Sequence, residues 1–174
     1  WGNLLVLAVV AACVLAGLWL VGGWRGGGEK SVQGTQEVTA GQVSAVDVPD
    51  SDLPAPELGQ KAPEFSGRTL EAEDFVLGES GRPTWLIFNA TWCSNCRAEM
   101  PDVQQAHEEF GDRVDIVSVF INDSPSAVAQ YSSTLKLSFI QIADANSDIA
   151  KLYRVMGVPS HYFIDANGTL TAIE

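Results

Sequence analysis

The chain has 174 residues, of which 46% are hydrophobic, which is enough for one ordinary domain with a core and some additional segments. It carries 22 acidic side chains against 10 lysines and arginines, a formal net charge of -12 at pH 7. This excess of negative charge argues against a nucleic-acid surface and against electrostatic attraction to anionic lipid. We therefore look for function in specific motifs rather than in overall charge.

The first segment, residues 1–24, is predicted to be a transmembrane anchor. Residues 4–21 contain no charged side chain and are nearly all leucine, valine and alanine. At about 1.5 Å per residue they reach roughly 27 Å, close to the hydrocarbon thickness of a bilayer. Trp1, Trp19 and Trp24 lie near the two ends, and tryptophan favours the membrane interface. We expect a single-pass anchor in the cell membrane, with an orientation that charge alone does not set.

A second kind of anchor is an alternative. The run from Val10 to Cys13 resembles the lipobox at which bacterial lipoproteins are cleaved and acylated on cysteine. The apolar run continues to Val21, however, whereas a mature lipoprotein usually becomes polar directly after its acylated cysteine. The uncleaved span is therefore the favoured interpretation. In either case we expect the protein to be tethered to a membrane.

Residues 25–58 are predicted to be a flexible linker. Three glycines at residues 26–28 are followed by serine, threonine, glutamine, scattered acids and several prolines. The segment has no apolar periodicity and too few large apolar residues to build a core, so we expect a disordered coil. A coil of this length has a reach on the order of 30 Å. The linker would join the anchor to a domain at residues 59–174.

Two cysteines stand at a predicted junction between a strand and a helix. The apolar, aromatic run at residues 85–88 predicts a buried strand. After Cys93 and Cys96, apolar residues recur at helical spacing. The helix is expected to continue to Phe110 and to end at Gly111 in the left-handed conformation. Cys93 therefore lies at the start of a helix, where unpaired backbone N–H groups and the helix dipole favour a thiolate.

The spacing of the two cysteines predicts a redox pair. Cysteines three positions apart at a helix start can close a small disulfide ring. We expect Cys93 to be the more exposed sulfur and the nucleophile, and Cys96 to be the resolving thiol. Arg97 adds a nearby cation that favours the thiolate. A structural zinc site would need a second pair of ligands, which the remaining cysteine and the two histidines do not supply.

The cysteines lie within a longer run that resembles a known family. Residues 88–101, FNATWCSNCRAEMP, are similar to the signature of membrane-anchored thioredoxin-like proteins of the bacterial envelope, the TlpA/ResA type that includes cytochrome c maturation factors. Residues 59–65 resemble the first segment of that family's domain, and residues 156–165 resemble its later strand, which begins with a cis-proline. The resemblance covers residues 59–174, and three motifs in order are far more specific than CxxC alone.

The rest of the domain predicts alternating strands and helices. The further elements expected are a hairpin at residues 65–77, a strand at 114–121, a helix opened by Ser124 and Pro125, a strand at 139–142, a helix at 146–153, a strand at 160–164, a turn at 165–168 and a strand at 169–173. This α/β order favours a largely parallel sheet ended by an antiparallel hairpin. It is the thioredoxin layout that the resemblance implies, a central mixed sheet flanked by helices. The family's closing helix is missing from this chain, so we expect one face of the sheet to lack its cover.

The resemblance implies further residues at the active site. Pro159 matches the family's cis-proline, and Val158 and Trp92 are implied to contact the substrate beside the first cysteine. Glu99 lies one turn beyond Cys96 and matches a glutamate beside the family's active disulfide, where a carboxylate can relay protons. Outside this context, a glutamate near a helix start is more often a solvated charge that complements the dipole.

Two positions depart from the family pattern. Ile87 stands where thioredoxin has a buried aspartate, which leaves Glu99 as the only nearby carboxylate candidate. His161 stands two residues after Pro159, where a small hydroxyl residue is expected. A protonated His161 facing the cysteines would stabilise the thiolate and make the disulfide more oxidising, whereas the alternative is a side chain that points away. His107 is roughly 16 Å along the helix from the cysteines and is predicted to lie at the edge of the core.

The predicted function is that of a membrane-tethered, extracytoplasmic thiol-disulfide oxidoreductase with no dissociable cofactor and no metal. The resemblance favours a reductase of exported thiol or disulfide proteins, such as apocytochrome c, recharged by a transmembrane electron donor. A disulfide-forming oxidase would use the same cysteines, and Ser94 and Asn95 between them do not decide the direction. A copper-binding chaperone with Cys93, Cys96 and His161 as ligands is a second candidate class, and a thiol peroxidase is a weaker third.

Overall fold

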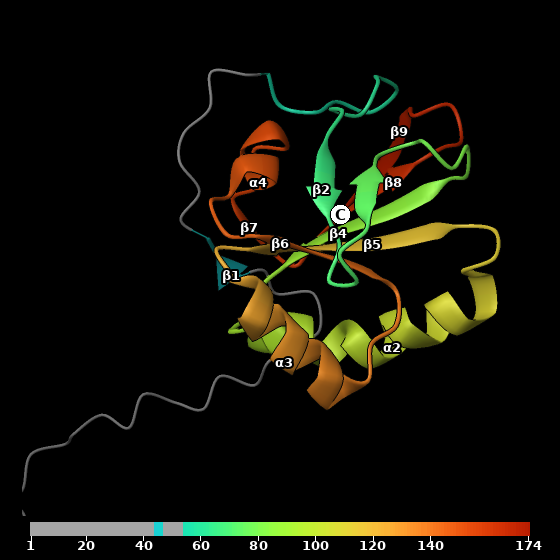
Figure 1. The fold of residues 1–174 in the computed structure, drawn as a ribbon. Helices are drawn as coiled ribbons and strands as arrows, with labels where there is room; N and C mark the ends of the chain where they lie inside the picture. Colours follow the sequence, from blue (N-terminus) through green and yellow to red (C-terminus); the bar gives the residue numbers. More distant parts are fainter. Residues whose placement is uncertain (1–43, 47–53) are drawn as a thin grey trace, which may run out of the picture. The chain divides into compact units, whose positions relative to one another are not determined.

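A computed structural model describes residues 44–46 and 54–174 of the chain (Figure 1). The predicted membrane span at residues 4–21, Cys13 and most of the predicted linker lie outside these residues. Within the two described ranges, no helix is both long enough and apolar enough to cross a bilayer. The structure therefore bears on the predicted domain and on two short pieces of the predicted linker.

The domain is built on a five-stranded sheet with the strand order β6-β5-β4-β8-β9. Strands β4, β5 and β6 are parallel to one another, whereas β8 is antiparallel to both β4 and β9. The elements of this part of the domain are β4 (Thr84–Asn89), α2 (Ser94–Phe110), β5 (Asp115–Ile121), α3 (Pro125–Leu135), β6 (Ile140–Asp144), α4 (Asp148–Leu152), β7 (Gly157–Val158), β8 (Ser160–Ile164) and β9 (Leu170–Ile173). This order confirms the predicted α/β class and the mixed sheet flanked by helices. A hairpin of β2 (Ser66–Arg68) and β3 (Asp74–Val76), also predicted, forms a separate two-stranded sheet.

Side chains of the central strand alternate between two apolar clusters. Leu86 and Phe88 join the cluster that contains residues of α4, whereas Ile87 joins the cluster that contains Met100 and Val103 of α2. Helices α2 and α3 cover one face of the sheet, while α4 and the β2–β3 hairpin cover the other (Figure 1). Because β4 is central and buried on both faces, it forms a firm base for the loop that carries the cysteines.

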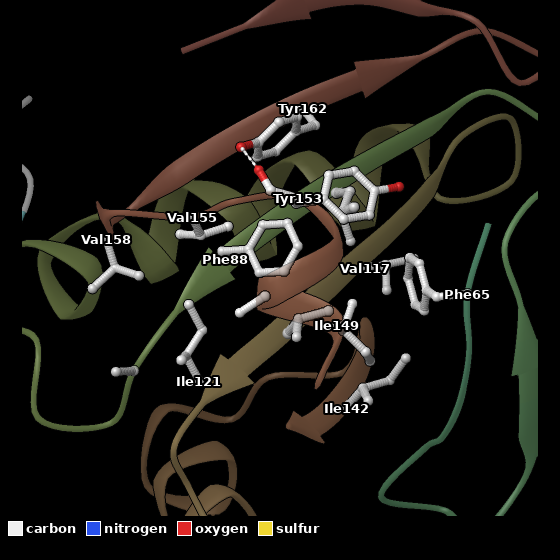
Figure 2. Packing of buried hydrophobic residues seen from close by; sticks show 14 of the residues in the cluster. Phe65, Phe88, Val117, Ile121, Ile142, Ile149, Tyr153, Val155, Val158 and Tyr162 are labelled. Atoms are coloured by element: carbon white, nitrogen blue, oxygen red, sulfur yellow. Dashed lines mark hydrogen bonds between the residues drawn. The ribbon is translucent and has the colours of Figure 1, made fainter. Parts of the chain in front are cut away.

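The cluster that contains α4 is organised by aromatic rings (Figure 2). The ring centroid of Phe88 lies 5.2 Å from that of Tyr153 and 5.5 Å from that of Tyr162. The Tyr162 hydroxyl donates a hydrogen bond to the Tyr153 carbonyl oxygen at 3.3 Å, and the Tyr153 hydroxyl donates to the Pro63 carbonyl oxygen at 2.8 Å. Burial raises the pKa of both tyrosines, so they stay neutral donors at physiological pH.

Local chemistry sets the ends of the helices on the other face. Helix α3 begins as predicted, with Pro125 in its first turn and the Ser124 hydroxyl accepting a hydrogen bond from the Ala127 N–H at 3.3 Å. The prediction for the end of α2 is wrong, because Gly111 has φ -64° and is not left-handed. A Cβ at this position would lie 2.6 Å from the His107 carbonyl oxygen. Glycine is therefore required here by close packing and not by positive φ.

Part of the predicted linker pairs with the domain. Strand β1 (Ser44–Ala45) is antiparallel to β7, and the Val46 N–H donates a hydrogen bond to the Met156 carbonyl oxygen at 3.3 Å. The expectation of a disordered coil is therefore wrong for residues 44–46. The physical reason is that an open strand edge presents backbone donors and acceptors that an extended segment can satisfy.

Candidate active site

Cys93 and Cys96 lie where β4 leads into α2, as predicted. Cys93 is the N-cap of the helix, and its Sγ accepts a hydrogen bond from the Cys96 N–H at 3.1 Å. The two sulfurs are joined in a disulfide, with 5.3 Å between the Cα atoms. The first turn of α2 thus directs a backbone donor and the positive end of its dipole at the Cys93 sulfur. This arrangement stabilises a thiolate there once the disulfide is opened.

Both cysteines are buried. Cys93 is 1% exposed and Cys96 is 0% exposed, so the predicted difference in exposure amounts to 1% and neither cysteine is open to solvent. The physical reason lies in the tertiary structure, because β7 packs beside the helix start and its Val158 carbonyl oxygen is 3.8 Å from the Cys93 Sγ. Trp92, the preceding residue, is 54% exposed. A partner would therefore meet Trp92 first and would reach the sulfur only when the surface beside it opens.

The segment that faces Cys93 contains the predicted cis-proline. The peptide bond between Val158 and Pro159 is cis, which confirms what the resemblance implies. Met156, just before β7, is 85% exposed. Exposed apolar side chains, Trp92 and Met156, therefore lie in the two segments that meet at the disulfide. These two side chains offer apolar contact area to a partner that approaches the disulfide.

Glu99 connects α2 to β8. Its Oε2 lies 3.5 Å from the His161 Nε2, and the Nδ1 of the same histidine accepts a hydrogen bond from the Trp85 indole N–H at 3.1 Å. In the sheet His161 lies opposite Ile87, on the face that α2 covers. An effect of His161 on the Cys93 thiolate stays a prediction. The ring nitrogens of His161 are directed at Trp85 and Glu99.

A second carboxylate, which was not predicted from the sequence, lies beside the loop that precedes the cysteines. Asp123 is 7% exposed, and its two oxygens accept hydrogen bonds from the Thr91 N–H and the Thr91 hydroxyl, both at 2.7 Å. Glu99 is therefore not the only nearby carboxylate, although Asp123 holds the loop before Cys93 with both of its oxygens. A sequence signal existed, because Asp123 follows β5, which is parallel to β4, and parallel strands end at the same edge of a sheet.

Arg97 packs against α3. Its guanidinium carbon lies 5.4 Å from the centroid of the Tyr131 ring. The pKa of Tyr131 is raised to about 12, chiefly by burial; the Arg97 charge lowers it and the Glu99 charge raises it. The Tyr131 hydroxyl is therefore neutral at physiological pH. The effect of Arg97 on the Cys93 thiolate stays a prediction.

The remaining predicted ligands are not gathered around the sulfurs. In the part of the chain that the structure describes, no three or more His, Cys, Asp and Glu side chains are grouped to hold a metal ion. His107 packs near the core with its ring centroid 6.2 Å from that of Phe139, as its predicted place at the edge of the core requires. His161 already uses both nitrogens in contacts with Trp85 and Glu99.

Comparison with known proteins identifies relatives of the whole domain. Residues 58–173 match the AhpC/TSA family. The chain is 34% identical over 120 residues to the thioredoxin-like protein YneN of Bacillus subtilis, covering 67% of this chain and 70% of YneN. It is 32% identical over 122 residues to the thiol-disulfide oxidoreductase ResA of Oceanobacillus iheyensis, covering 67% of this chain and 64% of ResA. A solved structure of a secreted Mycobacterium tuberculosis disulfide oxidoreductase homologous to E. coli DsbE is similar, with 31% identity, a TM-score of 0.56, and coverage of 62% of this chain and 80% of that one.

Proposed function

Because this chain belongs to the AhpC/TSA family and is a homologue of thiol-disulfide oxidoreductases with a thioredoxin-like fold, we propose that it reduces disulfides in exported proteins. The observation that carries the proposal is the Cys93–Cys96 disulfide at the N-terminus of α2, with the Cys93 Sγ 3.8 Å from the backbone of β7. Disulfide exchange needs an attacking sulfur, a resolving sulfur within reach and a place for the substrate chain. Cys93 and Cys96 supply the attacking and the resolving sulfur, and β7 is the proposed place for the substrate chain.

In the proposed reaction the reduced pair transfers two electrons to a substrate disulfide. The Cys93 thiolate attacks one substrate sulfur, the substrate S–S bond breaks, and the released thiolate takes up a proton. Cys96 then loses its proton and attacks Cys93, which closes the protein disulfide and releases the second substrate thiol. Glu99, one turn from Cys96, is the proposed acceptor of that proton. A dithiol of a transmembrane donor then reduces the protein disulfide again.

Trp92, Val158 and Pro159 are proposed to bind the substrate chain. The pairing of β1 with β7 supports this assignment, because it is an example of an extended segment lying along this edge in antiparallel register. A substrate chain that uses the same edge must displace β1. The linker would then compete with the substrate from within the same molecule.

Removal of the Val46 backbone N–H, which holds residues 44–46 beside β7, is expected to speed the reaction of the reduced protein with a peptide disulfide. The Val46→Pro variant has no N–H to donate to the Met156 carbonyl oxygen, which lies 3.3 Å away in the native chain. One such bond is worth about 1 kcal/mol, so we expect the second-order rate constant to rise about two- to fivefold. Val46→Ala keeps the N–H and is the matched control. Equal rate constants for Val46→Pro and Val46→Ala would contradict the proposal that the substrate chain displaces β1 from β7.

We place the proposed activity at the cell membrane, outside the cytosol. The uncharged apolar run at residues 4–21 supports a single-pass anchor, and acylation of Cys13 is the alternative tether. The family resemblance suggests apocytochrome c as an example of the exported substrate.

Redox titration of the full chain tests the direction of electron flow. The titration uses a Cys13→Ala background, so that only Cys93 and Cys96 are labelled after equilibration with defined thiol-disulfide buffers. A reductase is expected to have a potential more negative than about -220 mV, whereas a value near about -120 mV would reverse the direction to that of an oxidase. No reversible titration, together with stoichiometric retention of Cu(I), would instead support the copper chaperone.

A further inference from the structure

Glu99 and His161 bridge the two segments that flank the disulfide. Glu99 belongs to α2 and follows Cys96 by one helical turn, whereas His161 belongs to β8 and follows Pro159 by two residues. The distance between Glu99 Oε2 and His161 Nε2 is 3.5 Å, with the side chains 28% and 16% exposed. If Glu99 exchanges a proton with a sulfur, the orientation of its carboxylate decides whether the transfer is productive.

Trp85 determines which nitrogen of His161 carries the hydrogen. The indole N–H can only donate, and it lies 3.1 Å from the His161 Nδ1. Nδ1 must therefore accept, and a neutral imidazole that accepts at Nδ1 carries its hydrogen on Nε2. The Trp85 ring is itself held by stacking on Phe163, with centroids 5.6 Å apart and planes 18° apart. The two aromatic residues thus direct the Nε2–H of His161 at Glu99.

The two oxygens of Glu99 have different surroundings. Oε2 faces His161, whereas Oε1 is buried and has no hydrogen-bond partner among the residues that the structure describes. A buried carboxylate oxygen without a partner lowers stability, and such an oxygen has an unused lone pair that can accept a proton. The Glu99 charge acts on Tyr131 of α3 together with the charges of Arg97 and Asp123, so these groups share one electrostatic environment. Because Oε2 faces His161 at 3.5 Å, Oε1 is the oxygen left to exchange a proton.

We propose that His161 is a positioning residue for Glu99, set in its tautomer by Trp85. This inference rests on the proposed function, because His161 would orient Glu99, the base in the step in which Cys96 resolves the mixed disulfide. Oε1 of Glu99 accepts the proton that the Cys96 thiol loses as its sulfur attacks the mixed disulfide. The bond between Cys96 and Cys93 forms, the bond between Cys93 and the substrate sulfur breaks, and the electron pair leaves with the substrate thiolate.

The attacking and resolving steps can be timed separately with the small disulfide dithiobis(nitrobenzoate), which releases a coloured thiolate in each step. The reduced full chain in a Cys13→Ala background is expected to release one equivalent when Cys93 attacks and a second when Cys96 resolves. His161→Leu is expected to slow the second phase about tenfold and to change the first by less than about twofold. Glu99→Gln is expected to slow the second phase at least as much.

A double-mutant cycle separates positioning from general damage. If His161 acts through Glu99, His161→Leu has no further effect on the second phase in a Glu99→Gln background. His161→Gln keeps an N–H donor and is expected to restore most of the rate. Trp85→Phe keeps a ring beside Phe163 but loses the donor, so it is expected to slow the second phase. An unchanged second phase in His161→Leu, or an equal loss in both backgrounds, would overturn the proposal.

Nitrogen-15 NMR of the oxidised full chain gives a readout that does not depend on activity. Two-bond correlations from the ring protons of His161 are expected to show its hydrogen on Nε2, and a hydrogen on Nδ1 would overturn the proposal. Failure of the proposed function has a different signature, because the parent protein would then release no second equivalent of thiolate. If the parent protein shows both phases and His161→Leu has the same second-phase rate as the parent, only the positioning role of His161 is rejected.

Discussion

Replacement of Cys93 by serine is expected to abolish disulfide exchange, lowering its rate at least about a thousandfold. The attacking species is a thiolate, and a serine hydroxyl does not ionise at physiological pH to replace it. The structure places the helix N-terminus at this sulfur, whose Sγ accepts the Cys96 N–H at 3.1 Å, and so gives Cys93 the stronger stabilisation of negative charge. The measurement is the release of coloured thiolate from dithiobis(nitrobenzoate) by the reduced chain in a Cys13→Ala background.

Cys96→Ser is the matched control, because it removes the same disulfide and leaves the attacking sulfur in place. This variant is expected to release one equivalent of thiolate at nearly the parent rate of the first phase and then to stop as a stable mixed disulfide. The Cys93→Ser variant keeps the Cys96 thiol, which lies beyond the N-cap position that favours a thiolate and is therefore expected to react slowly with an external disulfide. If the Cys93→Ser variant reacted as fast as Cys96→Ser, the assignment of the nucleophile would be reversed.

Truncation of Phe88 to alanine is expected to lower the free energy of unfolding by about 3–5 kcal/mol. The side chain is 0% exposed, and its ring lies 5.2 Å from that of Tyr153 and 5.5 Å from that of Tyr162 (Figure 2). Its removal leaves a cavity that the tyrosines cannot fill without breaking their own hydrogen bonds to backbone carbonyl groups. Urea denaturation of the oxidised protein, followed by tryptophan fluorescence, measures the change.

Phe110→Ala is the same substitution at a surface position. Phe110 is 38% exposed at the end of α2, where its ring lies 5.2 Å from the guanidinium carbon of Arg113. Loss of this contact is expected to change the free energy of unfolding by about 1 kcal/mol or less. Similar losses for the two variants would show that the rings around Phe88 do not form the principal core.

The parts of the fold that depend on local pattern were predictable from the sequence. The apolar run at residues 85–88 lies within β4, and the cysteines lie at the start of the following helix. Helix α3 begins at Ser124 and Pro125, as predicted. The first backbone N–H groups of any helix lack partners within the helix, so a side-chain acceptor at the N-cap and a proline without an N–H are favourable there. Hydrophobic period and capping act over a few residues, so they can be recognised without tertiary structure.

Features that depend on segments distant in sequence were missed or wrongly predicted. The burial of Cys93 was not predicted because β7, far along the chain, packs beside it. Gly111 is required by its approach to His107 and not by its own backbone angle. The partners of His161 were not predicted because side-chain hydrogen bonds between strands depend on register and on which face a helix covers. Asp123 was not predicted because its hydrogen bonds to Thr91 join two loops that follow neighbouring parallel strands.

By itself, the sequence determined the class of fold, the order of the elements and the redox pair at a helix start, since each follows from interactions between near neighbours along the chain. Only the tertiary structure decided what surrounds that pair. It showed that both sulfurs are buried, that β1 lies along β7, and that Trp85, His161 and Glu99 form one polar network. The reason is physical: burial and hydrogen-bond direction depend on the packing of elements far apart in sequence, which the pattern within any one element does not encode.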